Sequence, residues 1–182
     1  MSETDLSSFD NSWYKPGSRV KIGLWYYVNL LFFKSSWLPI SSLKISLLRM
    51  FGGNIGANVV IKPAVSIKYP WKLSIGENTW IGENVWIDNL DTVTIGSNCC
   101  ISQGALLLCG NHNYKKTSFD LSTKPITIEN GAWIGAKSII SGGVTVGSHA
   151  VLAIGSITNK DLDPYTVYSG SPAQLVRKRI IS

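Results

Sequence analysis

Aliphatic residues recur at every sixth position through most of this chain, and no other feature restricts its fold as strongly. We call them lead residues, and they fall into four runs: Ile55, Ile61 and Ile67; Ile75, Ile81 and Ile87; Ile95, Ile101 and Leu107; Ile128, Ile134, Ile140, Val146 and Leu152. The fourth position after most lead residues holds Val, Thr, Cys, Ala or Ser: Val59, Val65, Thr79, Val85, Cys99, Ala105, Ala132, Ser138, Val144, Ala150 and Ser156. Gly often stands directly after the lead residue: Gly56, Gly76, Gly82, Gly96, Gly135 and Gly147.

A period of six fits neither an α-helix nor a coiled-coil heptad, but it fits a short strand followed by a tight corner. The lead residue then points inward, the small residue fills the next corner, and Gly serves where the chain bends through unusual dihedral angles. Three units close a triangular coil, and coils stack about 4.8 Å apart, as hydrogen-bonded strands do. The sequence therefore predicts a mainly all-β protein, a parallel β-helix of roughly five coils on the order of 25 Å long.

Interruptions of the repeat fall at one place in the coil. Trp71, Asp91 and Asn111 break the small-residue rule, and each belongs to the third unit of its coil. The first two coils carry two extra residues there, and the third carries a polar insertion, residues 108–125, which contains His112. We expect these interruptions to align along one edge of the prism. A loop on a rigid scaffold is a common place for function, although a tolerated surface insertion is the alternative.

The flanks of the repeat predict three regions in one domain. We expect an N-terminal arm and helical segment over residues 1–52, the β-helix over 53–160, and a C-terminal tail over 161–182. Helices are predicted over 20–34 and 42–51, the second with Ser41 and Ser42 as cap candidates. The tail residues 174–180, "QLVRKRI", predict a short helix or a strand lying back along the prism.

Charge, cysteine content and the apolar run restrict the partners and the cellular compartment of the protein. The formal net charge of +6 favours anionic partners but does not choose among phosphates, acidic polymers and a membrane surface. Three cysteines, two of them adjacent, argue against a disulfide framework and favour the cytoplasm. The apolar run at 22–33 is too short to span a bilayer. It predicts a buried helix covering the end of the prism or, as an alternative, an interfacial helix.

The chain resembles a known family. Its hexapeptide units, the insertion "LCGNHNY…FDLSTKPI" and the ending "NKDLDPYTVYSGSPAQLV" are similar to the left-handed β-helix acetyltransferases. "DLSSF", "IKYPWKLSIGENTWIG" and "ISQGALLLCGNHNY" resemble more narrowly the O-acetyltransferases of colanic-acid and exopolysaccharide synthesis. Parallel crossovers are right-handed almost everywhere, so the left hand is implied by the resemblance only. The resemblance also implies a homotrimer with active sites between subunits, and no nucleic-acid partner.

The family reaction implies a direct transfer of acetyl from acetyl-CoA to a sugar hydroxyl, without a required metal. The attacking hydroxyl needs a base, and an imidazole suits this because it is mostly neutral near pH 7. His112 matches the family's catalytic His, while His149 occupies an outward position of a regular repeat. A backbone donor for the developing oxyanion is expected near Gly135 and Ala136.

The resemblance also implies a coenzyme groove. Ala136, Ile154 and Asn159 match positions that hold the pantetheine arm, and Trp133 matches an aromatic residue beside it. Lys160 and Arg177 match basic positions near the nucleotide phosphates. Gln174 stands where relatives often have a second Arg, and Lys178 or Arg179 is expected to compensate for it. The expected donor site therefore consists of Trp133, Gly135, Ala136, Ile154, Asn159, Lys160 and Arg177.

The acceptor site is less well defined. Relatives that act on free galactosides or maltose place an Asn where this chain has Gly82, which argues against a free sugar as the acceptor. Asn84, Asp88 and Asn89 lie nearby and offer hydrogen-bonding groups. Three readings stay open: a sugar O-acetyltransferase of surface-polysaccharide synthesis working in the cytoplasm near the inner membrane, an N-acetyltransferase on an amino sugar, and a non-catalytic β-helix scaffold.

Overall fold

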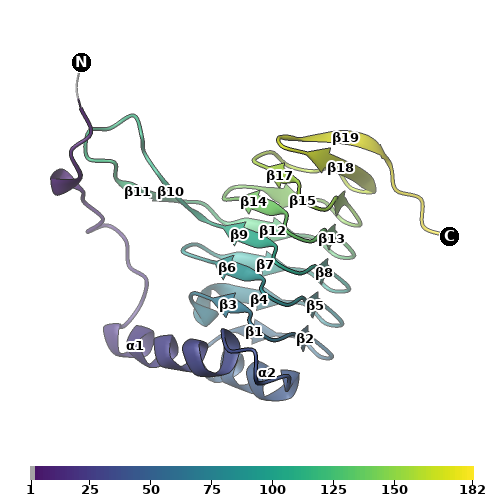
Figure 1. Ribbon diagram of the computed structural model, residues 1–182, viewed down its shortest axis with the longest axis horizontal. Helices are drawn as coiled ribbons and strands as arrows, with labels where there is room; N and C mark the ends of the chain where they lie inside the picture. The colour runs from purple at the N-terminus through teal and green to yellow at the C-terminus, as the bar shows by residue number, and fades with distance from the viewer. Residues whose placement is uncertain (1–2) are drawn as a thin grey trace.

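Three parallel sheets form the faces of a triangular prism in the computed structural model, which describes residues 3–182 (Figure 1). Sheet A consists of β1 (Asn54–Ile55), β4 (Leu73–Ile75), β7 (Val93–Ile95), β12 (Ile126–Ile128) and β15 (Thr145–Val146). Sheet B consists of β2 (Val60–Ile61), β5 (Trp80–Ile81), β8 (Cys100–Ile101), β13 (Trp133–Ile134), β16 (Val151–Leu152), β18 (Thr166–Gly170) and β19 (Ala173–Lys178). Sheet C consists of β3 (Ser66–Ile67), β6 (Trp86–Asp88), β9 (Leu106–Leu108), β14 (Ile139–Ser141) and β17 (Ile157–Thr158).

The core of the prism confirms the predicted pattern. Lead residues pair with the lead residues of the next coil until the last coil, as Ile55 does with Ile75 and Ile75 with Ile95. All fourteen lead residues and all eleven small residues that follow them are buried. Period six therefore places two side chains per unit inside the prism, one in the middle of a face and one at a corner.

The Gly residues after the lead positions have a different role from the expected one. Gly56, Gly76 and Gly135 do not adopt positive φ angles. A Cβ atom at these positions would instead lie 2.6, 2.5 and 2.5 Å from a backbone nitrogen of the next coil. The expectation of unusual dihedral angles was therefore wrong here: Gly is required because successive coils approach too closely for a side chain. The left-handed dihedral angles occur later in the unit, for example at Asn58 and Asn78.

Two helices cover the N-terminal end of the prism, as the sequence predicts (Figure 1), but the segment 22–33, expected as a buried helix, is buried on one side only. Helix α1 (Arg19–Val28) continues into a π-helical turn (Asn29–Phe33), and α2 (Ser41–Met50) follows. Trp25 of α1 packs in the core against Phe33 and Phe51. Among residues 3–182, no helix combines the length and the apolar character needed to cross a bilayer.

Side chains from the helices occupy the open hydrogen-bonding edges of the first coil. Trp25 Nε1 donates to the carbonyl of Ile67 on β3, at 2.8 Å, and Arg49 donates to the carbonyl of Ile55 on β1, at 2.7 Å. The hydroxyl of Ser41 lies 3.1 Å from both the amide nitrogen and the carbonyl oxygen of Ile61 on β2. The expectation that Ser41 is a helix cap was therefore wrong, since its hydroxyl bonds to the otherwise unpaired edge of sheet B instead. Capped edges prevent pairing with another chain.

The C-terminal end is closed by the tail. Leu162 pairs with Val146 at the end of sheet A, and β18 adds to β16 at the end of sheet B. The chain then reverses, and β19 pairs with β18 in antiparallel fashion. Of the two expected forms of the tail, the structure has the strand.

Candidate active site

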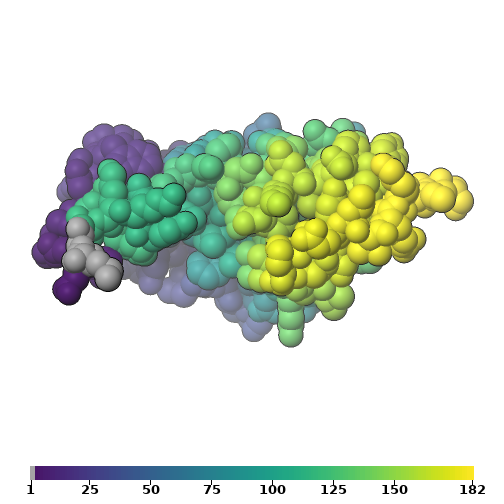
Figure 2. Space-filling model, turned by 90° about the horizontal axis from the view of Figure 1, so that it is seen from above, coloured from purple at the N-terminus to yellow at the C-terminus, as the bar shows by residue number. Residues whose placement is uncertain are grey.

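The insertion forms a hairpin that projects from the corner between sheets C and A (Figures 1 and 2). Its strands, β10 (Gly110–His112) and β11 (Leu121–Thr123), pair in antiparallel register with His112 opposite Leu121. At its base, Lys124 donates its backbone N–H to the carbonyl of Cys109, at 3.1 Å. The interruptions of the first two coils lie at the same corner, because Asn89 bonds through its side chain to the backbone of Tyr69. The predicted alignment of the interruptions along one edge is confirmed.

His112 is half-buried at the end of β10, and its ring is held on two sides. The imidazole stacks on Phe119, with ring centroids 4.5 Å apart and an interplanar angle of 7°, and Phe9 lies 6.0 Å away. Nδ1 lies 2.9 Å from the carbonyl oxygen of Phe119. A carbonyl oxygen only accepts hydrogen bonds, so Nδ1 carries the proton of the neutral ring and Nε2 keeps its lone pair. This arrangement leaves Nε2 able to accept a proton.

The N-terminal arm packs on the hairpin, and the sequence did not predict this contact. The backbone N–H of Asp5 donates to the carbonyl of Thr117, at 2.8 Å, and Figure 2 shows the arm beside the hairpin. Further along the arm, the hydroxyl of Tyr14 donates to the carbonyl of Leu90, at 2.6 Å. Burial raises the pKa of the Tyr14 hydroxyl well above its usual range, which keeps it a neutral donor. No spacing or repeat in the N-terminal segment indicates this contact in the sequence.

A groove of about 650 Å³ lies on the outer face of sheet B and brings together five of the seven expected donor-site residues. These are Trp133, Gly135, Ala136, Ile154 and Arg177. Trp133 is 47% exposed and donates from Nε1 to the hydroxyl of Ser102, at 2.9 Å. Asn159 and Lys160 do not line this groove; they follow β17 at the corner toward sheet A and are exposed.

Two guanidinium groups make the groove basic at one end. Arg177 of β19 lines it opposite Val167, and Arg179 lines it beyond the strand. Arg179 donates to the carbonyls of Gly131 and His149, both at 3.0 Å, which fixes its position. Of the two residues expected to compensate for Gln174, Arg179 lines the groove and Lys178 does not.

Gly135 and Ala136 differ in the hydrogen bonds that they have available. The N–H of Gly135 already donates to the carbonyl of Leu152 in the next coil, at 2.7 Å. Within the described part of the chain, the N–H of Ala136 makes no backbone hydrogen bond. Of the pair, Ala136 is therefore the residue with a free donor for a bound acyl group.

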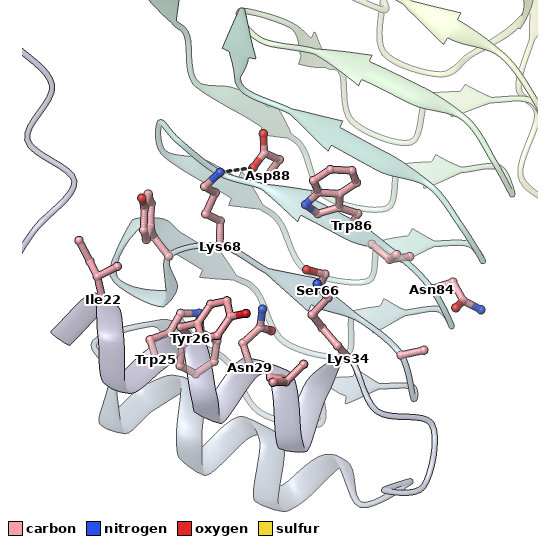
Figure 3. Close-up of a pocket in the computed structure, with 14 residues that line it drawn as sticks. Ile22, Trp25, Tyr26, Asn29, Lys34, Ser66, Lys68, Asn84, Trp86 and Asp88 are labelled. Atoms are coloured by element: carbon pink, nitrogen blue, oxygen red, sulfur yellow. Dashed lines mark ion pairs between the residues drawn. The ribbon is translucent and has the colours of Figure 1, made fainter. Parts of the chain in front are cut away.

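A second pocket of about 450 Å³ lies between α1 and the outer face of sheet C (Figure 3). Asn84 and Asp88 line it together with Trp86, and the side chains of Ile22 and Tyr26 face them from α1. Lys68 and Asp88 give the pocket a polar rim on one side, where Lys68 Nζ lies 3.3 Å from Asp88 Oδ1. Lys68 and Asp88 form an ion pair without a hydrogen bond, since Oδ1 of Asp88 has no hydrogen-bond partner among residues 3–182.

Asn89, the third expected acceptor residue, lies elsewhere. Its side chain is fully buried, accepts from the N–H of Tyr69 at 3.0 Å and donates to the carbonyl of the same residue at 2.6 Å. Both ends of the amide are therefore used within the coil. Asn89 joins the extra residues of two neighbouring coils and does not line the pocket.

The cysteines carry no sign of a nucleophile. Burial raises the pKa of the Cys109 thiol to about 11 and raises the pKa of the Cys99 thiol as well. A raised pKa keeps the thiol protonated near pH 7, and the thiolate is the reactive form. His149, the second histidine, stacks on Tyr165 at 4.7 Å in a corner of the prism. Within residues 3–182, no three His, Cys, Asp or Glu side chains are grouped to hold a metal ion.

Comparisons with known proteins agree with this architecture. The family model described as "hexapeptide repeat of succinyl-transferase" matches residues 72–109 and 125–157. The putative colanic acid biosynthesis acetyltransferase WcaF of Escherichia coli K12 is 36% identical over 177 residues, 97% of each chain. The galactoside O-acetyltransferase of the same organism is 34% identical over 136 residues, 73% of this chain and 67% of that one.

Solved structures share the fold. A hexapeptide-repeat acetyltransferase from Vibrio cholerae, complexed with acetyl-CoA, superposes with a TM-score of 0.79 at 25% identity, over 89% of this chain and 88% of that one. A galactoside acetyltransferase in complex with coenzyme A superposes with a TM-score of 0.77 at 29% identity, over 87% and 80%. On these grounds the chain belongs to the hexapeptide-repeat acetyltransferases, and its prism is the left-handed parallel β-helix of that family.

Proposed function

We propose that the protein transfers the acetyl group of acetyl-CoA to a hydroxyl of a sugar in surface-polysaccharide synthesis, of the colanic-acid or exopolysaccharide kind. The observation that carries the proposal is the fixed imidazole of His112, whose Nδ1 is committed to the Phe119 carbonyl and whose Nε2 is free to accept a proton. The near full-length relative with a putative role in colanic acid synthesis supports the substrate class.

The proposed mechanism gives each of the two sites one role. Nε2 of His112 takes the proton of the sugar hydroxyl as its oxygen attacks the thioester carbonyl. The N–H of Ala136 stabilises the negative charge that develops on the carbonyl oxygen. The C–S bond then breaks as the C–O bond is completed, and the proton on His112 passes to the departing thiolate of coenzyme A. This step needs no covalent acyl-enzyme, which agrees with the neutral buried thiols.

The donor and the acceptor occupy the two larger concavities. In the groove on sheet B, the pantetheine arm lies against Trp133, Ala136 and Ile154, and the guanidinium groups of Arg177 and Arg179 face the phosphates. The sugar enters the pocket on sheet C, where Trp86 offers an aromatic face and Asn84 and Asp88 offer hydrogen-bonding groups. We keep Asn159 and Lys160 as proposed donor contacts contributed at a different corner of the prism.

A complete site requires neighbouring chains, since the hairpin with His112 leaves the prism at the corner between sheets C and A, whereas the groove lies on the outer face of sheet B. The outer faces support a homotrimer. The outward residues of sheet A are all polar: Asn54, Ser74, Thr94, Thr127 and Thr145. Those of sheets B and C are mostly apolar: Val60, Trp80, Cys100, Trp133, Val151 and Val167; and Ser66, Trp86, Leu106, Ile139 and Ile157. Two apolar faces and one polar face suit a closed ring in which sheet B meets sheet C of the next copy.

The trimer has a direct test. Trp80 is 61% exposed on sheet B and does not line the groove, so Trp80→Glu should release single subunits in light-scattering measurements. Thr94→Glu on sheet A should leave the trimer intact. A wild-type protein that is monomeric at all concentrations would remove the shared active site from the proposal.

The activity is tested by thiol release from acetyl-CoA with a panel of sugars and amino sugars. We expect turnover with a saccharide hydroxyl, and a fall of about 10²- to 10⁴-fold in kcat for His112→Ala with coenzyme binding retained. Lys115→Ala, an exposed position on the same hairpin, serves as the matched control. Turnover with amino sugars alone would point to N-acetylation, and no binding of coenzyme A in calorimetry would favour a scaffold. The cytoplasm, which supplies acetyl-CoA, is the proposed location, and three free cysteines fit it.

A further inference from the structure

Helix α1 is apolar on the side that faces away from the prism. Val20, Leu24 and Tyr27 follow one another at spacings of four and three residues, so they lie on one face of the helix. They are 72%, 58% and 64% exposed. Leu30 and Leu31 extend this exposed surface through the π-helical turn that follows. The opposite side carries the buried Trp25, so residues 22–28 of α1 have apolar side chains on both sides, which is unusual for a helix that packs on one side only.

The remainder of the same end of the molecule adds further exposed apolar side chains. Trp37 and Ile40 lie in the segment between the two helices, and Met50 ends α2; all three are more than half exposed. Both helices lie across the N-terminal end of the prism (Figure 1). We call the outer side of α1, the connecting segment and α2 the base of the molecule. Contiguous exposed apolar surface of this kind marks an interaction site.

The charge of the base is of one sign. Between residues 11 and 76 the sequence contains nine Lys and Arg residues and no Asp or Glu. In the rest of the chain, eight cations are outnumbered by eleven carboxylates, so the whole positive excess comes from this segment. Lys15, Arg19 and Lys34, which flank the apolar side of α1, are exposed. The base therefore combines an apolar stripe with a purely cationic surround.

We propose that the base binds the surface of an anionic lipid bilayer, with α1 lying in the plane of the interface. An interfacial helix inserts its apolar side among the acyl chains, while nearby Lys and Arg side chains reach the anionic headgroups. Tyr26, Tyr27 and Trp37 are of the amphipathic aromatic kind that settles at headgroup depth. Attraction to anionic lipid increases with each cation close to the surface, and the base has no carboxylate to oppose it.

Membrane binding would deepen the proposed function, because the acceptor pocket opens beside the same helix. Ile22 and Tyr26 of α1 form one wall of that pocket, opposite Trp86 and Asp88 (Figure 3). The pocket therefore lies within about one helix diameter, ~10 Å, of the lipid surface. This consequence rests on the proposed acceptor role of the pocket, whereas the binding of lipid by the base stands without it.

Flotation with vesicles tests the proposal on the full-length protein. We expect the protein to float with vesicles of mixed phosphatidylglycerol and phosphatidylcholine, to remain behind with phosphatidylcholine alone, and to be released by high salt. Leu24→Glu should weaken the partition coefficient about tenfold or more, because a buried Leu contributes about one power of ten to binding. Leu24 does not line the acceptor pocket.

Leu175→Glu is the matched control, with the same substitution at a residue 55% exposed on β19, at the opposite end of the prism. It should leave vesicle binding unchanged. An equal loss in both variants, or no loss in Leu24→Glu, would overturn the proposal. The proposal would also be overturned if Leu24→Glu changed the number of subunits and left flotation unchanged, since a second copy of the chain would then cover the base. Thiol release with a soluble acceptor should be retained by Leu24→Glu, so failure of lipid binding and failure of acetyl transfer are distinguishable.

Discussion

The imidazole of His112 and the phenyl ring of Phe119 lie nearly parallel with centroids 4.5 Å apart, and the carbonyl oxygen of the same Phe119 accepts a hydrogen bond from Nδ1 at 2.9 Å. One residue thus holds the ring in its plane and selects its tautomer. Phe119 does so with a φ angle of +51°, which is uncommon for a bulky residue. Unfavourable backbone geometry maintained beside a candidate base is consistent with a functional constraint.

Phe119→Ala should lower kcat while leaving the KM for acetyl-CoA unchanged. The substitution keeps the carbonyl that selects the tautomer and removes only the stacked ring. A stacked aromatic pair contributes about 0.5–1.5 kcal/mol, so we expect a loss of up to about tenfold in kcat. Steady-state kinetics measures it, with Tyr114→Ala, 74% exposed on the same hairpin, as the control. An unchanged kcat would show that the stack does not position His112.

Much of the fold could be predicted because the six-residue repeat recurs in every coil. The fourteen lead residues all lie inside a face of the prism, and the eleven small residues all lie inside a corner. The same pattern therefore recurs in every coil and is easy to detect in the sequence. The position of the insertion followed from the same count. The role of Gly135 was harder to predict, because φ angles and the approach of the next coil both favour Gly and only coordinates separate them.

Contacts between distant segments were not predictable. The seal that Ser41 makes on Ile61 and the contact of Phe9 with His112 each join residues far apart in sequence, and no local pattern marks them. For the same reason Asn89 was expected to contact the acceptor, since a polar residue near a predicted site resembles a ligand contact in the sequence. Its bonds to Tyr69 depend on two coils carrying their extra residues at the same corner.

Gly135→Ala should destabilise the protein and weaken coenzyme binding together. The added Cβ would lie 2.5 Å from the backbone nitrogen of Ile154, so two coils that form the groove must separate. Overpacking of this kind costs about 1–3 kcal/mol, and we expect a higher KM for acetyl-CoA. Chemical denaturation and kinetics measure the two effects.

Gly23→Ala gives the contrast for that measurement. Gly23 lies within α1 with no atom close enough to meet a new Cβ, so Ala should stabilise the helix by about 0.5–1 kcal/mol. Similar effects at both positions would contradict the explanation by coil spacing.

Asn89→Ala should reduce the free energy of unfolding by about 2 kcal/mol, because it leaves the buried N–H of Tyr69 without a partner and removes one of the two hydrogen bonds to the Tyr69 carbonyl, which also accepts from the N–H of Lys72. Asn84→Ala provides the comparison. Asn84 is exposed, so its loss should cost less than about 1 kcal/mol, including the cost of Ala at its φ of +58°. Urea denaturation separates the two, and equal losses would contradict the structural role of Asn89.

Lys44 is fully buried in α2, where its ammonium group donates to the carbonyl of Lys62 at 2.9 Å. Burial lowers the pKa of this amine below its ordinary value of 10.5. A lowered pKa for a base means that the folded state binds the proton less tightly than the unfolded chain. Charged Lys44 therefore destabilises the fold at neutral pH, and this penalty disappears as the pH rises from the lowered pKa toward 10.5.

Replacement of Lys44 by Met removes that penalty with an apolar side chain of similar length. We expect Lys44→Met to be more stable than the wild type by about 1 kcal/mol at pH 7, because buried charges are often outperformed by packed apolar groups. The difference should shrink as the pH approaches 10. Thermal or urea unfolding across this range measures it, and Lys62→Met, at an exposed side chain in the same region, should show no such trend. A stability difference that grows with pH would have the wrong sign and would exclude a depressed pKa for Lys44.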